Sequence, residues 1–286
     1  MKLSILDQSP LSAARTRHEA LRSSVDYAVL AEELGYARVW FAEHRGHAAF
    51  AGNSPLVLAS AVLERTQQIK VGTGGVLIGF HSPNTIGEAF IALNNLHPGR
   101  VEAGTGRANA EQSLYLGHID QFTRMMRTAE IPSWVLGTSP RSAELANALD
   151  VGFVHGHFFN PGSAEQSLLA LDPGRPRILG VRIVTGPSAQ QAEDAARRFL
   201  RWRSRKDLGV NEPLPRATDD PENFDPSLED LMQRNRAAIV TGTPDRIAEQ
   251  LHQLSERTGA EEIMITHPEP APDAASWALK ALAAEL

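Results

Sequence analysis

Residues Gly99 to Asn109, read as GRVEAGTGRAN, are the stretch from which the rest of this 286-residue chain is best understood. They follow Leu96-His97-Pro98, where a proline marks the end of a helix, and they begin with a short strand at 101–104. The strand leads into Thr105-Gly106-Arg107. Small residues at a strand end let the backbone approach a ligand, and the arginine adds a permanent cation that suits a phosphate. The alternative is an ordinary strand-to-loop turn with a surface arginine.

The composition is that of a globular protein, with 42% hydrophobic and 22% charged residues. The chain has no cysteine, which excludes disulfides, thiolate nucleophiles and cysteine-based metal sites and is compatible with the cytosol. A net charge of −6 argues against a nucleic-acid partner. No apolar run is long enough to cross a membrane, and the acidic Asp7 interrupts any signal peptide. We therefore expect a cytoplasmic protein without a membrane partner.

Eight apolar segments alternate with segments of helical periodicity along the chain. The predicted strands are residues 3–6, 39–42, 69–78, 101–104, 133–136, 153–155, 178–185 and 262–266. This alternation, with short links, is typical of a parallel sheet covered by helices. We predict a single (β/α)8 TIM barrel domain over residues 1–286, with its site at the carboxyl ends of the strands. A doubly wound sheet is the structural alternative.

The predicted helices have proline, serine or threonine near their starts, as helix N-termini commonly do. They are residues 19–34, 54–64, 84–96, 139–149, 163–171, 188–206, 243–258 and 274–286. Residues 208–226 are rich in Pro, Asp and Asn, which predicts a long mobile loop. In a barrel this loop is a candidate lid over the site.

Two segments next to predicted strands have residues that suit a ligand. Thr138-Ser139 lies where a helix begins, so hydroxyls and free backbone N–H groups there could bind an anion. Ser139 could instead be only the helix cap. Gly74-Gly75 lies within an apolar strand, where two glycines cost stability. Either a flat ligand pressed against the backbone or a bulge with tight barrel packing would explain the pair.

Histidines follow two of the predicted strands. His44 could be a general acid or base near neutral pH, or a structural histidine held by hydrogen bonds. His155 and His157 are two residues apart and could bind a metal if His44, His267 or Asp7 supplied further ligands. The alternative is that both simply line the barrel.

Taken together, these segments resemble the bacterial luciferase-like family of flavin-dependent monooxygenases, and the resemblance covers most of the chain. Within the family, the chain is most similar to single-chain members from bacterial secondary metabolism. The similarity is densest in four stretches: Glu43-His44 after residues 39–42, residues 71–76, residues 82–108 and residues 240–244.

The resemblance implies a (β/α)8 barrel, usually a homodimer, that binds reduced FMN supplied by a separate flavin reductase. It also implies that O₂ is the co-substrate, that a flavin 4a-hydroperoxide forms in a dry pocket, and that one oxygen is delivered to a small organic or polyketide-like metabolite.

Residue by residue, the resemblance implies that Arg107 and Arg124 bind the flavin phosphate. It implies that Thr138, Ser139 and Ser142 form the phosphate-binding turn after the fifth strand of the barrel.

The remaining two matches concern the flavin ring. Gly74 and Gly75 match the small-residue pair against which the ring lies, which the family joins by a cis non-proline peptide. His44 matches the histidine beside the reacting edge of the flavin, where it would control protonation.

The chain departs from the family pattern in two places. Only residues 125–130 separate Arg124 from the following strand, so the fourth β-α segment is shorter than usual. Arg45 stands where many members have a second histidine, and it could contact an anionic substrate. The aromatic residues that could line the pocket suggest an uncharged, partly aromatic or aliphatic substrate; they are Phe50, Phe80, Phe158 and Phe159.

Three other functions remain open at this level. A shortened family member could bind a flavin without catalysing a reaction. The cofactor could be the deazaflavin coenzyme of sister families, which transfer hydride and do not insert oxygen. A metal-dependent barrel hydrolase built on His155 and His157 would need carboxylate and lysine ligands that the sequence does not show.

Overall fold

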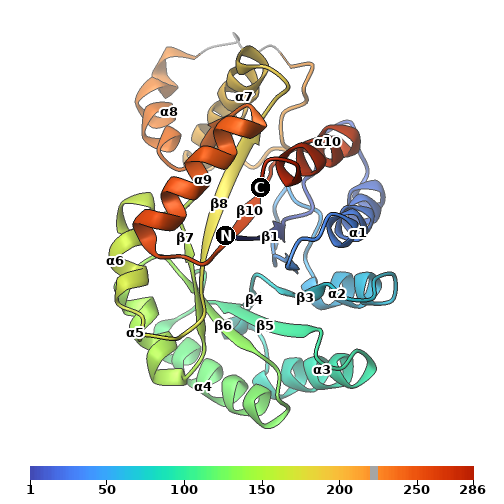
Figure 1. Ribbon diagram of the computed structural model, residues 1–286, viewed down its shortest axis with the longest axis vertical. Helices are drawn as coiled ribbons and strands as arrows, with labels where there is room; N and C mark the ends of the chain where they lie inside the picture. The colour runs from blue at the N-terminus through green and yellow to red at the C-terminus, as the bar shows by residue number, and fades with distance from the viewer. Residues whose placement is uncertain (220–224) are drawn as a thin grey trace.

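Eight parallel strands close into a barrel in the computed structural model, which describes residues 1–219 and 225–286 (Figure 1). Strand β1 pairs with both β2 and β10, and β10 also pairs with β8, which closes the ring. This confirms the (β/α)8 prediction over the doubly wound alternative, because an open sheet would leave two edge strands. The barrel strands are β1 (Lys2–Asp7), β2 (Arg38–Phe41), β3 (Lys70–Thr73), β5 (Val101–Gly106), β6 (Ser133–Gly137), β7 (Gly152–Gly156), β8 (Arg177–Thr185) and β10 (Glu262–Thr266).

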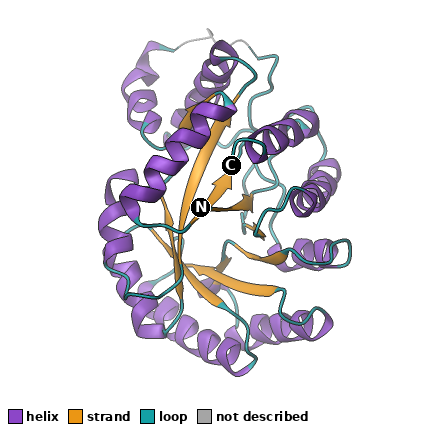
Figure 2. Cartoon of the chain, viewed as in Figure 1, coloured by secondary structure: helices purple, strands orange, loops and turns teal. Residues whose placement is uncertain are grey.

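A ring of helices surrounds the strands (Figures 1 and 2). Thr16 begins α1 with a reciprocal capping box to Glu19, and proline occupies an early position in five of the helices. No helix in the described ranges is long and apolar enough to cross a membrane. The helices are α1 (Arg17–Glu33), α2 (Pro55–Leu63), α3 (Pro83–Leu96), α4 (Gln112–Thr128), α5 (Pro140–Leu149), α6 (Ala164–Leu169), α7 (Ala189–Asp207), α8 (Glu229–Arg236), α9 (Pro244–Thr258) and α10 (Pro272–Ala283).

The predicted strand over residues 69–78 is divided in the structure. It consists of β3, a turn at Gly74-Gly75, the two-residue β4 (Val76–Leu77) and a 3₁₀ turn at Ile78–Phe80. Strand β4 pairs with β5 beyond the point where β3 stops pairing with it. The continuous apolar run hid this break, because burial and not strand geometry makes the run apolar.

Two elements near the carboxyl end of β8 were not predicted. Helix α8 packs against α7, and β9 (Val240–Gly242) pairs with the last three residues of β8. The fourth β-α unit, expected to be shortened, contains a 17-residue helix, α4, that was not predicted. Residues 107–111 join β5 to α4, and residues 129–132 join α4 to β6.

The first part of the predicted mobile loop is attached to the body of the protein. Leu214 donates its backbone N–H to the carbonyl of Leu11 at 2.9 Å. Asn211 bonds to the carbonyl of Gly46 and to the N–H of Ala48, both at 2.9 Å. Residues 220–224 lie outside the described residues, so the mobility of the loop remains a prediction.

Alternate residues of each strand fill the inside of the barrel. The central cluster contains two of the four tryptophans of the chain, Trp40 and Trp134, whose rings meet edge to face with centroids 5.4 Å apart. Its buried members are Leu6, Trp40, Ala42, Trp134, Val154, Phe158, Ile178 and Met264. The residues between them along the strands face the helices and form the larger outer core.

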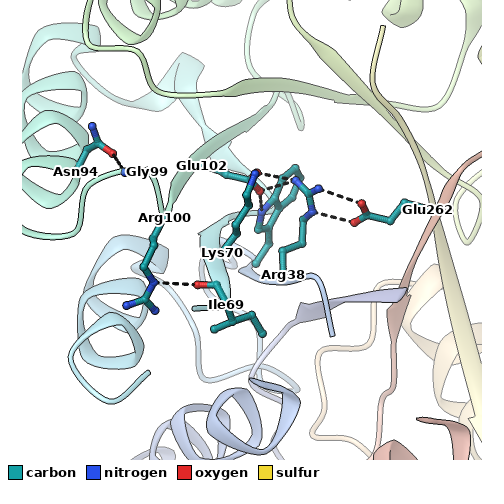
Figure 3. A network of polar contacts seen from close by, with 9 residues as sticks. Arg38, Ile69, Lys70, Asn94, Gly99, Arg100, Glu102 and Glu262 are labelled. Carbon is teal, nitrogen blue, oxygen red and sulfur yellow. Dashed lines mark hydrogen bonds and ion pairs between the residues drawn. The ribbon is translucent and has the colours of Figure 1, made fainter. Parts of the chain in front are cut away.

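The amino end of the barrel is closed by a charged cluster that we call the floor: Arg38, Lys70, Glu102 and Glu262. Arg38 lies between the two carboxylates, 2.6 Å from Glu102 and 2.8 Å from Glu262 (Figure 3). Trp40 donates its indole N–H to Glu102 at 2.9 Å, and the Lys70 ammonium is 3.7 Å from the same carboxylate. The floor therefore pairs its buried charges within the chain.

Arg100 has a structural role at the start of the stretch 99–109. Gly99 has φ of +73°, a left-handed conformation that favours glycine. The Arg100 guanidinium then donates to the carbonyls of Leu63, Thr66 and Ile69 at 3.3, 2.8 and 3.2 Å, the last of which is drawn in Figure 3. These bonds attach the start of β5 to the link between α2 and β3.

Candidate active site

The carboxyl end of the barrel, which we call the mouth, brings most of the predicted site residues onto neighbouring strands. The strand order β2–β3–β5–β6 places His44, Gly74-Gly75, Arg107 and Thr138-Ser139 at four consecutive strand ends. β5 pairs with β6 through Thr105↔Val135, two residues before Arg107 and three before Thr138. The candidate phosphate residues therefore lie on adjacent strand ends.

The Gly74-Gly75 peptide is cis, and the surrounding chain lies close to both glycines. A Cβ on Gly74 would lie within 2.4 Å of the Leu6 side chain. A Cβ on Gly75 would lie 2.9 Å from the carbonyl of Gly104. Tight barrel packing therefore accounts for the glycine at Gly75, where the neighbouring atoms are backbone, whereas the contact at Gly74 is with the end of the Leu6 side chain.

Glu43 attaches the segment after this turn to the end of β2. Its buried carboxylate accepts from the Leu77 N–H at 2.9 Å and contacts Arg45 at 2.7 Å and His81 at 2.9 Å. Burial alone would raise the pKa of Glu43, but the hydrogen bonds from Leu77, His81 and Arg45 outweigh it and lower the pKa below its usual value. Glu43 is therefore a buried anion that holds the glycine turn in place.

Arg45 is bound within this group and is not a free cation. Besides its ion pair with Glu43, its guanidinium lies 5.4 Å from the centre of the Phe80 ring. The expectation that Arg45 contacts an anionic substrate is not supported by these contacts, because the carboxylate of Glu43 already occupies it.

The turn before α5 has the donor groups of an anion site. The hydroxyls of Ser139 and Ser142 are 3.3 Å apart, and the Ser139 side chain makes no capping bond to its helix. Thr138, which precedes the two serines, is partly exposed. Arg107, on the neighbouring strand end, is exposed. Ser139 is thus the N-cap residue by position, but its hydroxyl contacts the Ser142 hydroxyl and does not cap the helix.

Arg124 lies away from this group. It is on the exposed side of α4, 73% accessible, and pairs with Asp120 at 2.8 Å one turn earlier. Arg127, three residues later, donates to the carbonyl of Leu149 at the end of α5, which is at the amino end of the barrel. Because α4 runs back from the mouth, the structure does not bring Arg124 to Arg107 and the serines.

His44 lies at the mouth on the segment after β2. Its ring stacks on Phe50 with centroids 4.3 Å apart and an angle of 28°, and its buried Nδ1 has no hydrogen-bond partner in the described chain. Burial, together with the charges of His47, Lys206 and Arg182 themselves, lowers the pKa of His44 to about 3. The imidazole is therefore neutral at pH 7.

His155 and His157 do not form a metal site with other residues. His155 shares the outer face of β7 with Phe153, whose ring is 6.4 Å away, and its Nε2 contacts the carbonyl of Asn160. Burial, with the charges of His155 and Arg257, lowers the pKa of His157 to about 4. Within residues 1–219 and 225–286, no group of three or more His, Asp or Glu could hold a metal ion.

Two cations at the mouth were not singled out from the sequence. Arg182 lies within β8, and Lys206 lies near the end of α7. The available signal was an arginine inside the apolar run RILGVRIVT, at a position that alternation assigns to the barrel interior. A charged residue there needs a partner, which makes it a candidate for binding.

Comparisons with known proteins bear on the family and the fold of the chain. The sequence model of the family described as luciferase-like monooxygenase matches residues 1–127. The uncharacterized protein YwcH of Bacillus subtilis is 30% identical, over 93% of each chain. The luciferase-like monooxygenase of Escherichia coli K12 is 28% identical, over 92% of this chain and 90% of that protein. The crystal structure of apo-MsnO8 superposes with a TM-score of 0.81 at 26% identity, covering 100% of this chain and 98% of that one.

A closed parallel barrel surrounded by helices, together with relatives that are named monooxygenases, places the chain among barrel-type oxidoreductases. The chain belongs to the luciferase-like monooxygenase family.

Proposed function

We propose that this protein is a flavin-dependent monooxygenase that takes reduced FMN from a separate reductase and uses O₂ to oxygenate a small organic molecule. The observation that carries the proposal is the row of strand ends β2–β3–β5–β6. These strand ends present a neutral histidine, a cis-glycine turn, an exposed arginine and a hydroxyl-rich helix start side by side.

The residues at the end of β6 fit a phosphate monoester. The first turn of α5 leaves backbone N–H groups without helical partners, and the helix dipole favours an anion there. The hydroxyls of Thr138, Ser139 and Ser142 add donors, and Arg107 on the next strand end adds a positive charge. We assign the FMN phosphate to these four residues, without Arg124.

The turn at Gly74-Gly75 fits the flavin ring. The two glycines present backbone without side chains at the mouth, and Glu43 holds the following segment through Leu77. When bound, FMN would supply the two-electron chemistry with O₂ that no side chain of this chain provides. The contribution of the chain is to position the ring and to exclude water.

His44 acts on protons at Nδ1 or Nε2 as a neutral imidazole. With a pKa of about 3 it does not bring a positive charge into the site at pH 7, so it works as a proton acceptor or a hydrogen-bond donor. Stacking on Phe50 fixes the plane of its ring. His44→Ala is expected to lower substrate oxygenation while leaving FMN affinity nearly unchanged.

The proposal is tested by titrating the full chain with oxidised FMN, with anaerobically reduced FMN and with deazaflavin, followed by fluorescence. Tighter binding of reduced FMN than of the other two, and oxygenated product when a reductase and O₂ are supplied, would support it. Tight FMN binding without product from any substrate would favour a non-catalytic flavin-binding protein. Preference for the deazaflavin would favour a hydride-transferring oxidoreductase.

A further inference from the structure

Arg182 is a buried arginine at the mouth whose charge has no ion-pair partner within residues 1–219 and 225–286. Its residue is only 5% exposed, and its Nε is fully buried without a hydrogen bond. Within the described ranges, the contacts of its guanidinium are with the rings of Phe158 and Phe199, and its Nε has no hydrogen-bond acceptor. Leaving a buried charge uncompensated is expensive, so the position favours an acceptor group that the described residues do not supply.

The position of Arg182 in β8 directs it to the inside of the barrel. Ile178, four residues earlier, belongs to the central cluster, and residues of the same parity face the same side of a strand. Arg182 is level with Thr266 of β10, the last residue of that strand. The guanidinium therefore lies inside the barrel at its mouth, above the apolar centre.

The surroundings of Arg182 are aromatic and positively charged. Its Cζ is 4.6 Å from the centre of the Phe158 ring and 5.3 Å from that of Phe199. These rings attract a cation but offer no strong acceptor for its five N–H groups. Burial, with the charge of Arg203, lowers the pKa of Arg182 to about 9, which still leaves it charged at pH 7.

A second cation, Lys206, lies nearby without an ion pair in the described ranges. It lines a cavity of about 230 Å³ together with His47, Trp202 and Asn211. Burial, followed by the charges of Arg203 and Arg182, lowers its pKa, and Asp207 opposes this. Asp207 itself is engaged by Arg203 at 3.0 Å. The charge facing this part of the mouth is thus net positive.

We infer that Arg182 binds an anionic group of the substrate, and that the substrate of the proposed monooxygenase is a carboxylate with an apolar body. The planar fork of a guanidinium matches a carboxylate through two parallel hydrogen bonds. Trp202, which lines the cavity beside Lys206, would contact the apolar part of the molecule. This inference rests on the proposed function and replaces the expectation of an uncharged substrate.

The candidate phosphate site is on other strands, which separates the two anions. Arg107 and Ser139 follow β5 and β6, whereas Arg182 is on β8, and β7 lies between β6 and β8. His44, whose pKa is lowered in part by the charge of Arg182, lies on the opposite side of the glycine turn from β5. A carboxylate at Arg182 would hold the substrate within reach of the histidine side of the site.

The test is isothermal titration of the full chain, without flavin, with benzoate, phenylacetate and octanoate and with the three corresponding neutral amides. We expect at least one carboxylate to bind more tightly than its amide. Arg182→Met should weaken the binding of that carboxylate about 10- to 100-fold and leave the affinity for the amide unchanged. Arg182→Lys keeps the positive charge but lacks the planar guanidinium, so its affinity for the carboxylate should lie between those of the unaltered protein and Arg182→Met. Arg22→Met, which removes an exposed arginine of α1, is the matched control.

The inference is overturned if no carboxylate binds below about 10 mM, or if Arg182→Met and the unaltered protein bind it equally. An FMN titration of the same variants separates the two sites. Loss of FMN affinity in Arg182→Met as large as the loss of carboxylate affinity would assign Arg182 to the cofactor and contradict the inference. Carboxylate binding through Arg182 in a protein that binds no FMN would support the anion site and refute the proposed function.

Discussion

Arg38 and Arg182 are both arginines buried inside the same barrel, one at the floor and one at the mouth. Arg38 lies between Glu102 and Glu262, with a lysine and an indole N–H completing the group. Among the described residues, Arg182 contacts the rings of Phe158 and Phe199, and a second cation, Lys206, lies nearby. The two arginines thus have similar burial and opposite electrostatic environments.

The difference distinguishes a structural charge from a binding charge. A guanidinium paired inside the chain offsets its own cost of burial and closes the barrel. A guanidinium left without an acceptor lowers the stability of the empty protein and is available to an anion. The same contrast separates two arginines near the glycine turn. Arg45 forms an ion pair with Glu43, whereas Arg107 is exposed beside a hydroxyl-rich turn.

The largest expected effect is at the floor. Arg38→Met would leave Glu262 buried without its ion pair and Glu102 with only Lys70 and the Trp40 indole N–H, and we expect the free energy of unfolding to fall by about 3–5 kcal/mol. Urea denaturation followed by circular dichroism measures it. Replacing both carboxylates by glutamine in the same variant should recover most of the loss. A decrease below about 1 kcal/mol would show that the floor pairs contribute little.

The second effect is pH dependence at the end of β7. His157 is buried and neutral in the folded protein, with a pKa lowered to about 4, whereas it titrates near 6.5 when unfolded. The unfolded state therefore binds the extra proton first, and stability is lost as the pH falls from 6.5 toward 4. The loss from this residue is up to about 3 kcal/mol.

The pH prediction is checked by urea denaturation across that range in the unaltered protein and in His157→Gln. The variant should lose less stability on acidification. Two parallel curves would mean that His157 does not titrate between the folded and unfolded states as described. The buried His155, whose pKa burial also lowers, should add a decrease of the same sign.

The third effect separates the exposed arginines. Arg107→Ala is expected to weaken FMN binding about 10- to 100-fold, because it removes a charge-assisted contact to the phosphate. Arg124→Ala should change the affinity less than about twofold, since its side chain pairs with Asp120 on α4. Fluorescence titration of both variants with FMN decides between them. Equal losses of FMN affinity in the two variants would show that Arg124 also binds the phosphate.

The smallest effect concerns the stability of the mouth. Arg182→Met removes an unpaired buried charge, so we expect the free energy of unfolding to rise by about 1 kcal/mol, opposite in sign to the change at Arg38. Thermal and urea denaturation without ligand measure the change. A clear loss of stability would indicate that the rings of Phe158 and Phe199 depend on the guanidinium for their packing.

Much of the fold could be predicted from the sequence because periodicity and breakers act locally. The eight barrel strands and the helix starts at Pro55, Pro83, Pro140 and Pro244 follow from apolar runs and proline positions. The break at Gly74-Gly75 could not be placed, because the contacts that require it come from Leu6 on β1 and Gly104 on β5. Helix α8 and strand β9 were missed because they are short and depend on packing against α7 and β8.

For the site, the sequence alone determined which residue types stand at the strand ends, since strand order and polarity are properties of the chain. His44, Arg107 and Ser139 are found in that way. Only the tertiary structure decided which of these groups are free. Whether an arginine is paired depends on carboxylates far away in the chain, as with Arg38 and Glu262, which are 224 positions apart. Arg182 became a candidate only when its surroundings were known, because a charge acts through its neighbours in space and not through its neighbours in sequence.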